Sequence, residues 1–324
     1  MICLGIEGTA HTLGVGIVDG KKILSNAKDV YVPAKGGIHP IEAKNHHHAV
    51  KEKILEEALS KANISIDDVD LIAYSAGPGL PPCLKVVAEF ASELAKNTKK
   101  PLIEVNHCIS HIEIGKLMTS AVDPITIYVS GGNTQIIGYA SQRYRVFGET
   151  QDISIGNAID TFIREATGNA GSGGPVMERL AKGGKYIELP YVVKGMDLSF
   201  SGIMTAALQK HKQGAKIEDL CYSFQETCYS MLTEVTERAM AHTAKKECLL
   251  TGGVAASQRL QEMLRIMCEE RNAKFFVCPR EFAGDNGAMI AWNGLLAYSH
   301  RQKTCSGDFH QRWRTDEVEI EWIK

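Results

Sequence analysis

Residues 125–134 of the 324-residue chain read ITIYVSGGNT, and this stretch decides the fold. Its apolar, β-branched first half predicts a buried strand, and Gly-Gly-Asn-Thr predicts a turn. Residues 135–139 then predict the return strand of a hairpin. The N-terminus follows the same plan, because predicted strands at 2–6 and 13–18 flank another glycine–threonine connection. The repeat indicates two related α/β units with a nucleotide between them, and two unrelated hairpins of similar design are the alternative.

A strand–helix–strand pattern follows in the first half of the chain. Residues 69–75 predict a strand, 83–96 a helix and 102–105 a second strand, which implies a parallel pair. The next helix therefore leaves the carboxyl end of a parallel strand, where α/β proteins place their sites.

That helix carries His107 and His111, and Asn106 can cap its first turn. Residues four apart lie on one helix face, so the two imidazoles could hold one metal ion. Cys108 follows His107 where zinc proteases have a glutamate, so their general base is missing. One packed and one solvated histidine is the alternative. The three histidines 46–48 point in three directions on a predicted helix and are expected to be mostly solvated.

The second half of the chain continues as predicted helices joined by glycine-rich connections. Asp160 lies in a predicted helix over 155–166, Gly174 ends the glycine-rich loop 168–174, and Glu178 lies in the next predicted helix. Ser257 follows the glycine turn 252–253, and Asp285 precedes a predicted helix that runs through 296.

Composition excludes several classes of protein. The chain is 44% hydrophobic, as globular proteins are, and its length fits two domains or one large one. No apolar run approaches the roughly 20 residues that span a bilayer, and the N-terminus lacks a secretory signal. Nine scattered cysteines without a Cys-x-x-Cys pair indicate the reduced thiols of a cytoplasmic protein. The net charge of −2 gives no field for nucleic acid, so an RNA substrate would need a local basic patch or partner proteins.

The chain resembles the universal family of tRNA threonylcarbamoyladenosine synthases. These were formerly labelled O-sialoglycoprotein endopeptidases, and in archaea and eukaryotes they are the catalytic subunit of the KEOPS complex. The match runs from residue 4 to residue 316, and its most specific segments are 106–111, 128–134, 195–202, 252–256 and 284–289. The archaeal form is the nearer match, because Tyr128 and Asn133 stand where bacterial relatives usually carry leucine and histidine.

The resemblance implies an α/β protein with the actin-like ATPase fold, in which a nucleotide cleft lies between two RNase H-like lobes. One lobe is expected to comprise residues 1–120 and 293–324, and the other residues 121–292. Glu7 stands where actin-like ATPases commonly place an aspartate. The resemblance also implies a metal site with donors suited to iron or zinc, formed by His107, His111, Tyr128 and Asp285.

The same resemblance implies which residues bind the nucleotide part of the substrate. They are Tyr128, Val129, Ser130, Gly131, Gly132, Asp160, Gly174, Glu178 and Ser257. Relatives usually have asparagine at the position of Ser257, whose hydroxyl can still donate or accept a hydrogen bond. Asp160 and Glu178 would accept hydrogen bonds from ribose hydroxyls. No general base is assigned.

The implied activity is acyl transfer to tRNA. A threonylcarbamoyl group passes from threonylcarbamoyl-AMP to N6 of the adenosine just 3′ of the anticodon, position 37, in tRNAs that read codons beginning with adenine. ATP could occupy the same nucleotide site. The implied partners are tRNA, an atypical kinase/ATPase subunit that some archaea fuse to this chain, a small dimerising subunit and a regulatory subunit, with no membrane. A metalloprotease and an ATPase of the actin-like fold are the alternatives.

Overall fold

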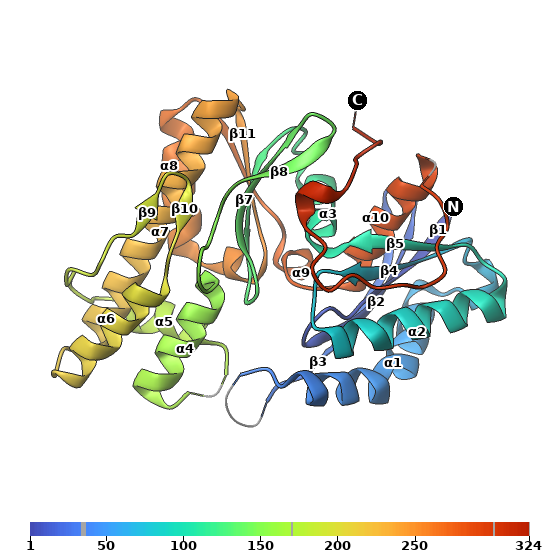
Figure 1. Ribbon diagram of the computed structural model, residues 1–324, viewed down its shortest axis with the longest axis horizontal. Helices are drawn as coiled ribbons and strands as arrows, with labels where there is room; N and C mark the ends of the chain where they lie inside the picture. The colour runs from blue at the N-terminus through green and yellow to red at the C-terminus, as the bar shows by residue number, and fades with distance from the viewer. Residues whose placement is uncertain (34–36, 170, 301, 324) are drawn as a thin grey trace. The chain divides into compact units, whose positions relative to one another are not determined.

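The computed structural model describes residues 1–33, 37–169, 171–300 and 302–323 and divides into two compact units (Figure 1). Unit 1 comprises residues 1–118, 140–144 and 284–324, and unit 2 comprises residues 119–139 and 145–283. None of the helices within the described ranges has the length and apolar character needed to cross a bilayer.

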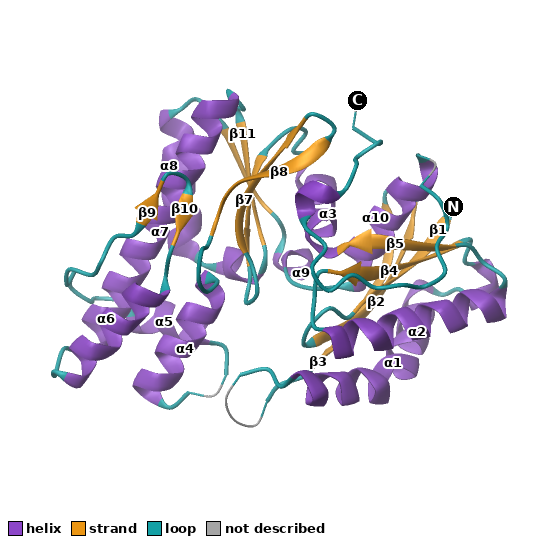
Figure 2. Ribbon diagram, viewed as in Figure 1, coloured by secondary structure: helices purple, strands orange, loops and turns teal. Residues whose placement is uncertain are grey.

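Unit 1 is built on a five-stranded mixed sheet in the order β3-β2-β1-β4-β5 (Figure 2). β1 and β3 pair antiparallel with β2, whereas β4 pairs parallel with both β1 and β5. Helices α1 and α2 pack on one face of this sheet and α10 on the other. The elements are β1 (Ile2–Glu7), β2 (Thr12–Asp19), β3 (Lys22–Val30), α1 (Pro40–Ala62), η1 (Ile66–Asp68), β4 (Leu71–Gly77), α2 (Pro81–Thr98), β5 (Leu102–Asn106), α3 (His107–Thr119), α10 (Gly287–Ser299) and η3 (Thr315–Glu317).

Unit 2 repeats this plan with a sheet in the order β12-β11-β6-β7-β8. β6 is central, with the antiparallel partner β7 on one side and the parallel partner β11 on the other. The predicted repeat of two related α/β units is therefore confirmed, and β3, for which the sequence pattern gave no prediction, completes it. The elements are β6 (Ile125–Val129), β7 (Thr134–Ala140), β8 (Arg143–Glu149), α4 (Ile155–Thr167), α5 (Gly173–Leu180), β9 (Val193–Lys194), β10 (Asp197–Leu198), α6 (Ser201–Lys212), α7 (Ile217–Thr243), β11 (Glu247–Thr251), η2 (Gly253–Ala256), α8 (Gln258–Glu270), β12 (Lys274–Val277) and α9 (Arg280–Ala283).

Each unit has its own hydrophobic core. In unit 1, buried strand residues such as Ile6 and Tyr74 belong to the same hydrophobic cluster as Phe90 of α2. In unit 2, the rings of Phe162 on α4 and Phe224 on α7 stack with centroids 5.1 Å apart. Burial of this apolar surface supplies the main driving force for folding each unit.

The division into units moves the expected lobe boundary. The boundary expected between residues 292 and 293 falls inside α10, and the whole of α10 belongs to unit 1. The reason is packing, because α10 lies against β1 and β2 of that sheet. We propose that the two units are the two expected lobes, with residues 284–292 assigned to the first.

The expectation that histidines 46–48 are mostly solvated is wrong for His47. His48 is exposed, but His47 is fully buried on the inner face of α1. Burial, together with the nearby His46, lowers the pKa of His47 to about 4, so its imidazole is neutral at pH 7. His47 is therefore part of the packing between α1 and the body of unit 1.

Glycines allow α10 to lie directly on β1 and β2. A Cβ atom added to Gly16 on β2 would lie 2.1 Å from the backbone nitrogen of Ala288, and one added to Gly287 would lie 2.1 Å from the nitrogen of Gly16. Backbone can approach backbone this closely only where no Cβ intervenes. Asn286 caps the helix, because its Oδ1 accepts the N–H of Met289 at 3.0 Å. The preceding residue, Asp285, is thereby held directly before the first turn of α10.

Asn106 fixes the start of α3, as the sequence predicts. Its Oδ1 accepts the N–H groups of Cys108 and Ile109 at 3.0 and 3.2 Å. We expect Asn106→Ala to lower the free energy of unfolding by roughly 0.5–2 kcal/mol, the usual cost of losing a cap. Urea unfolding measures this, with Asn45→Ala at an exposed position of α1 as the control. Equal unfolding midpoints for the two variants would contradict the capping role.

Candidate metal centre

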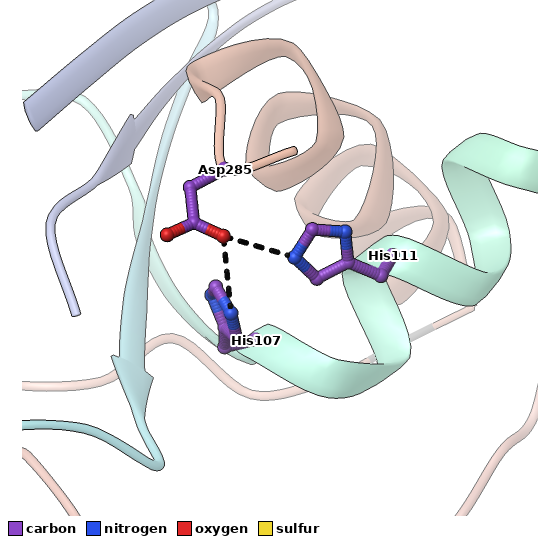
Figure 3. A group of neighbouring side chains, drawn as sticks. All are labelled: His107, His111 and Asp285. Carbon is purple, nitrogen blue, oxygen red and sulfur yellow. Dashed lines mark hydrogen bonds and ion pairs between the residues drawn. The ribbon is translucent and has the colours of Figure 1, made fainter. Parts of the chain in front are cut away.

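His107 and His111 form one side of the candidate metal centre. They lie one turn apart on α3, directly after β5, and both are buried. Their ring centroids are 4.7 Å apart and the ring planes meet at 83°. Both imidazoles point to the same side of the helix (Figure 3), so the prediction of a shared face is confirmed.

Asp285 completes the cluster from the loop before α10. Its Oδ1 lies 3.3 Å from Nε2 of His111 and 3.7 Å from Nε2 of His107 (Figure 3). Each of the three residues offers one donor atom, and these atoms all lie within 4.8 Å of one another. All three residues belong to unit 1.

The donor set fits a transition metal. Two imidazole nitrogens and one carboxylate oxygen are ligands that iron and zinc accept, whereas calcium and magnesium prefer oxygen alone. Three protein ligands also leave coordination positions for a substrate, as catalytic metal sites do. The residues present therefore fit an iron or zinc ion.

Glu7 supports the cluster from the end of β1. Its Oε2 lies 3.0 Å from Nδ1 of His107, and its Oε1 accepts the N–H and the hydroxyl of Thr9 at 2.8 and 2.7 Å. With an ion in the cluster, Nδ1–H of His107 would donate to Glu7 and the Nε2 lone pair would be available to the metal. The family resemblance identifies Glu7 only as the counterpart of an aspartate in actin-like ATPases. Its pairing with His107 spans 100 residues, and no local signal predicts it.

The electrostatics of the cluster favour positive charge. Burial by itself would lower the pKa of His107, but the negative charges of Glu7 and Asp285 raise it to about 9. Burial opposes ionisation of Asp285, yet the hydrogen bond with His111 and the charge of His107 hold its pKa well below the usual range. Burial lowers the pKa of His111 by more than the hydrogen bond with Asp285 raises it. The carboxylates of Glu7 and Asp285 thus lie on either side of a position where a cation is stabilised.

Glu7→Gln should weaken metal binding while leaving the fold intact. The amide keeps the shape of the side chain but removes the charge that holds His107, and loss of such supporting contacts typically costs about 10- to 100-fold in metal affinity. Competition with a chromophoric chelator measures the affinity, with Glu56→Gln on the exposed face of α1 as the control. An affinity equal to that of the control variant would show that Glu7 has no part in the centre.

Tyr128, the expected fourth ligand, lies on β6 in unit 2. Its side chain is fully buried, and its hydroxyl oxygen is 3.5 Å from the amide nitrogen of Asn133. The cluster that the structure brings together contains the two histidines and Asp285, so a role for Tyr128 as a ligand stays a prediction.

The turn after Tyr128 is held in shape by its own hydrogen bonds. Ser130 Oγ accepts the N–H groups of Gly132 and Asn133 at 3.3 and 3.0 Å. Gly156 at the start of α4 lies against this turn, since a Cβ there would be 2.4 Å from the carbonyl oxygen of Ser130. Cβ atoms added to Gly131 and Gly132 would meet nothing within 4 Å, so both glycines face open space.

Four further predicted site residues gather around the starts of α5 and α8. Asp160 accepts the N–H of Gly173 at 2.6 Å, and Glu178 accepts the N–H of Gln258 at 3.0 Å. Ser257 caps α8 by accepting the N–H of Leu260 at 3.5 Å. Gly174 follows Gly173 in the first turn of α5. The structure thus brings these residues together within unit 2. Asp160, Glu178 and Ser257 each also accept a backbone N–H at the start of a helix.

Solved structures define the class of fold. HypF of T. kodakarensis matches with a TM-score of 0.64 at 15% identity, over 91% of this chain and 47% of that one. Component A of (R)-2-hydroxyglutaryl-CoA dehydratase from Acidaminococcus fermentans matches with a TM-score of 0.56 at 12% identity, over 91% and 97% of the two chains. The protein therefore has the actin-like ATPase fold, as expected.

Sequence comparison defines the family within that class. Residues 22–292 match the family model described as TsaD, tRNA N6-adenosine threonylcarbamoyltransferase. A tRNA N6-adenosine threonylcarbamoyltransferase from Thermococcus kodakarensis is 57% identical over 99% of this chain and 100% of that protein. The chain belongs to the TsaD family of acyltransferases, and the expected family is confirmed.

A second kind of relative is longer than this chain. A probable bifunctional tRNA threonylcarbamoyladenosine biosynthesis protein from Methanobrevibacter smithii is 55% identical over the whole chain, which spans 60% of that protein. The chain therefore corresponds to one part of the bifunctional relatives and to the full length of the others.

Proposed function

We propose that this chain transfers a threonylcarbamoyl group from threonylcarbamoyl-AMP to N6 of adenosine 37, in tRNAs that read codons beginning with adenine. Membership of the family supports the class of reaction. The observation that carries the site is the cluster of His107, His111 and Asp285, whose donor atoms lie within 4.8 Å of one another beside the buried carboxylate of Glu7.

We propose that this cluster holds one iron or zinc ion, with Tyr128 as a fourth ligand. When bound, the ion supplies Lewis acidity and a fixed attachment point for the donor substrate. His107 and His111 hold their positions because Asn106 fixes the start of α3, and Asp285 holds its position because Asn286 caps α10.

We assign binding of the adenylate end of the donor, or of ATP in its place, to residues of unit 2. Residues 128–132 would contact it through the glycine turn, where Gly131 and Gly132 face open space. Gly174 also leaves space for the approach, because no atom lies within 4 Å of an added Cβ. Asp160, Glu178 and Ser257 would contact the ribose. A carboxylate has about four lone-pair sites, so the backbone contacts already made by Asp160 and Glu178 leave capacity for ribose hydroxyls.

The reaction requires positioning more than activation of the donor. N6 of the adenosine forms a bond to the carbonyl carbon, the bond from that carbon to the phosphate oxygen breaks, and AMP leaves as one amine proton is released. The donor is already a mixed anhydride, so holding the two reactants in line can supply much of the rate enhancement.

Partners are expected to complete the tRNA-binding surface. The net charge of −2 gives the chain as a whole little attraction for a polyanion, so tRNA binding needs a local basic patch or basic surface from partners. We propose the KEOPS subunits as these partners, and the bifunctional names of longer relatives are consistent with a joined second component. All nine cysteines are unbridged thiols, which supports a cytoplasmic setting.

Reconstitution tests the proposal. The chain, with and without its partners, is incubated with threonylcarbamoyl-AMP and unmodified tRNA, and the nucleosides are analysed by mass spectrometry. Threonylcarbamoyladenosine should form in the complete mixture, with little from the isolated chain. Rapid ATP turnover insensitive to His107→Ala and His111→Ala, without modified nucleoside, would favour an ATPase instead. Metal-dependent cleavage of a glycoprotein would favour a protease.

A further inference from the structure

Helix α3 also buries a carboxylate, on the side away from the histidines. Glu113 follows His111 by two residues and therefore lies about 200° around the helix from it. Its side chain is only 4% exposed. The carboxylate thus lies on the rear face of α3, opposite to the face that carries the two imidazoles.

Three side chains meet the Glu113 carboxylate. Oε1 accepts the hydroxyl of Tyr144 at 2.5 Å and the indole N–H of Trp322 at 2.9 Å. Oε2 lies 3.5 Å from the ammonium group of Lys116. Burial of a carboxylate costs free energy unless the group is paired and hydrogen-bonded. The three contacts therefore stabilise the Glu113 side chain in this position.

Trp322 belongs to a C-terminal segment that also contacts the start of α3. The amide of Asn106 donates to the carbonyl oxygen of Trp313 at 3.1 Å. Between these two points Ile320 N–H donates to the carbonyl oxygen of Gln142 at 2.9 Å, next to Tyr144. The C-terminal segment, residues 313–322, runs beside α3 in Figure 1. Hydrogen bonds connect it to Asn106, directly before the first turn of α3, and to Glu113 in the second turn.

We propose that Glu113, Tyr144 and Trp322 are positioning residues that orient the metal-binding face of α3 by holding its rear face. This inference rests on the proposed metal centre. His107 and His111 keep their place against Asp285 because the opposite side of the helix is tied to the C-terminal segment. Loss of these hydrogen bonds lets α3 rotate or shift, which weakens metal binding although no metal ligand is changed.

Trp322→Phe removes the indole N–H and keeps an aromatic ring. We expect the dissociation constant for zinc, measured in the full chain against a chromophoric chelator, to rise about three- to tenfold. Trp292→Phe on α10 is the matched control, because its indole N–H makes no hydrogen bond to any described residue. The control should keep the affinity of the wild type, and thermal unfolding of both variants reports their stability.

Glu113 variants provide a second, graded test. Glu113→Gln keeps an oxygen that can accept from Trp322, whereas Glu113→Ala keeps none. The alanine variant should bind zinc more weakly than the glutamine variant, and Trp322→Phe should add little to the effect of Glu113→Ala, because both remove the same contact.

The outcomes separate this inference from the proposed function. If the wild type binds zinc, His111→Ala does not, and Trp322→Phe binds as tightly as the wild type, the positioning role is wrong and the metal centre stands. A lower melting temperature of Trp322→Phe with unchanged zinc affinity also overturns it, since the segment would then only stabilise the fold. If wild type and His111→Ala bind zinc equally, the metal centre itself is wrong.

Discussion

His111→Ala should abolish metal binding and lower the rate of tRNA modification by more than about 100-fold, because it removes a ligand where loss of a supporting contact alone costs about 10- to 100-fold. His111 is fully buried and its Nε2 is 3.3 Å from Asp285. Without His111, the clustered donors His107 and Asp285, even with Tyr128 as the proposed further ligand, would hold an ion only weakly. Alanine is the best helix former, so α3 should persist.

Metal content by mass spectrometry and nucleoside analysis of the tRNA check this result together. His48→Ala is the control for metal content, since His48 is an exposed histidine of α1 in the same unit. Circular dichroism should show a folded protein for both variants. Full modification activity by His111→Ala without bound metal would contradict the assignment of the site.

Gly16→Ala should destabilise the whole of unit 1 by about 3 kcal/mol or more, at the upper end of the cost of overpacking. The added Cβ would lie 2.1 Å from the nitrogen of Ala288 and 2.5 Å from its Cα. Both are backbone atoms of α10, so no side chain can rotate away to relieve the clash. The helix must move off β2, and Asp285 moves with it.

Urea unfolding and metal content measure the two consequences of Gly16→Ala. The control is Gly37→Ala, at an exposed glycine where an added Cβ meets nothing within 4 Å. The control should retain both stability and metal. Equal unfolding midpoints for the two variants would show that the close contact between β2 and α10 is not needed.

Sequence reasoning predicted those parts of the site that local patterns encode. The spacing of His107 and His111 fixes their shared helix face, and Asn106 caps that helix as expected. The repeated hairpin pattern predicted the common plan of the two sheets. Asp285 entered only through the family resemblance, because nothing in its neighbourhood links it to residues 174 or more positions earlier.

The remaining features depend on contacts between distant segments. Periodicity cannot show that Glu7 meets His107, or that Trp322 reaches Glu113 across 209 residues. His47 is expected to be solvated because three consecutive histidines point in three directions on a helix, yet its face of α1 packs inward. The packing of α10 on β1 and β2, on which the proposed assignment of residues 284–292 to the first lobe rests, is likewise a tertiary contact.

The most direct test is to strip the wild-type protein with a chelator, restore one equivalent of iron or zinc, and quantify threonylcarbamoyladenosine in tRNA at each stage with the partners present. We predict that modification is lost on stripping, returns with the metal in the wild type, and does not return in His111→Ala. Modification at the full rate by the stripped wild-type protein would contradict a metal centre at His107, His111 and Asp285.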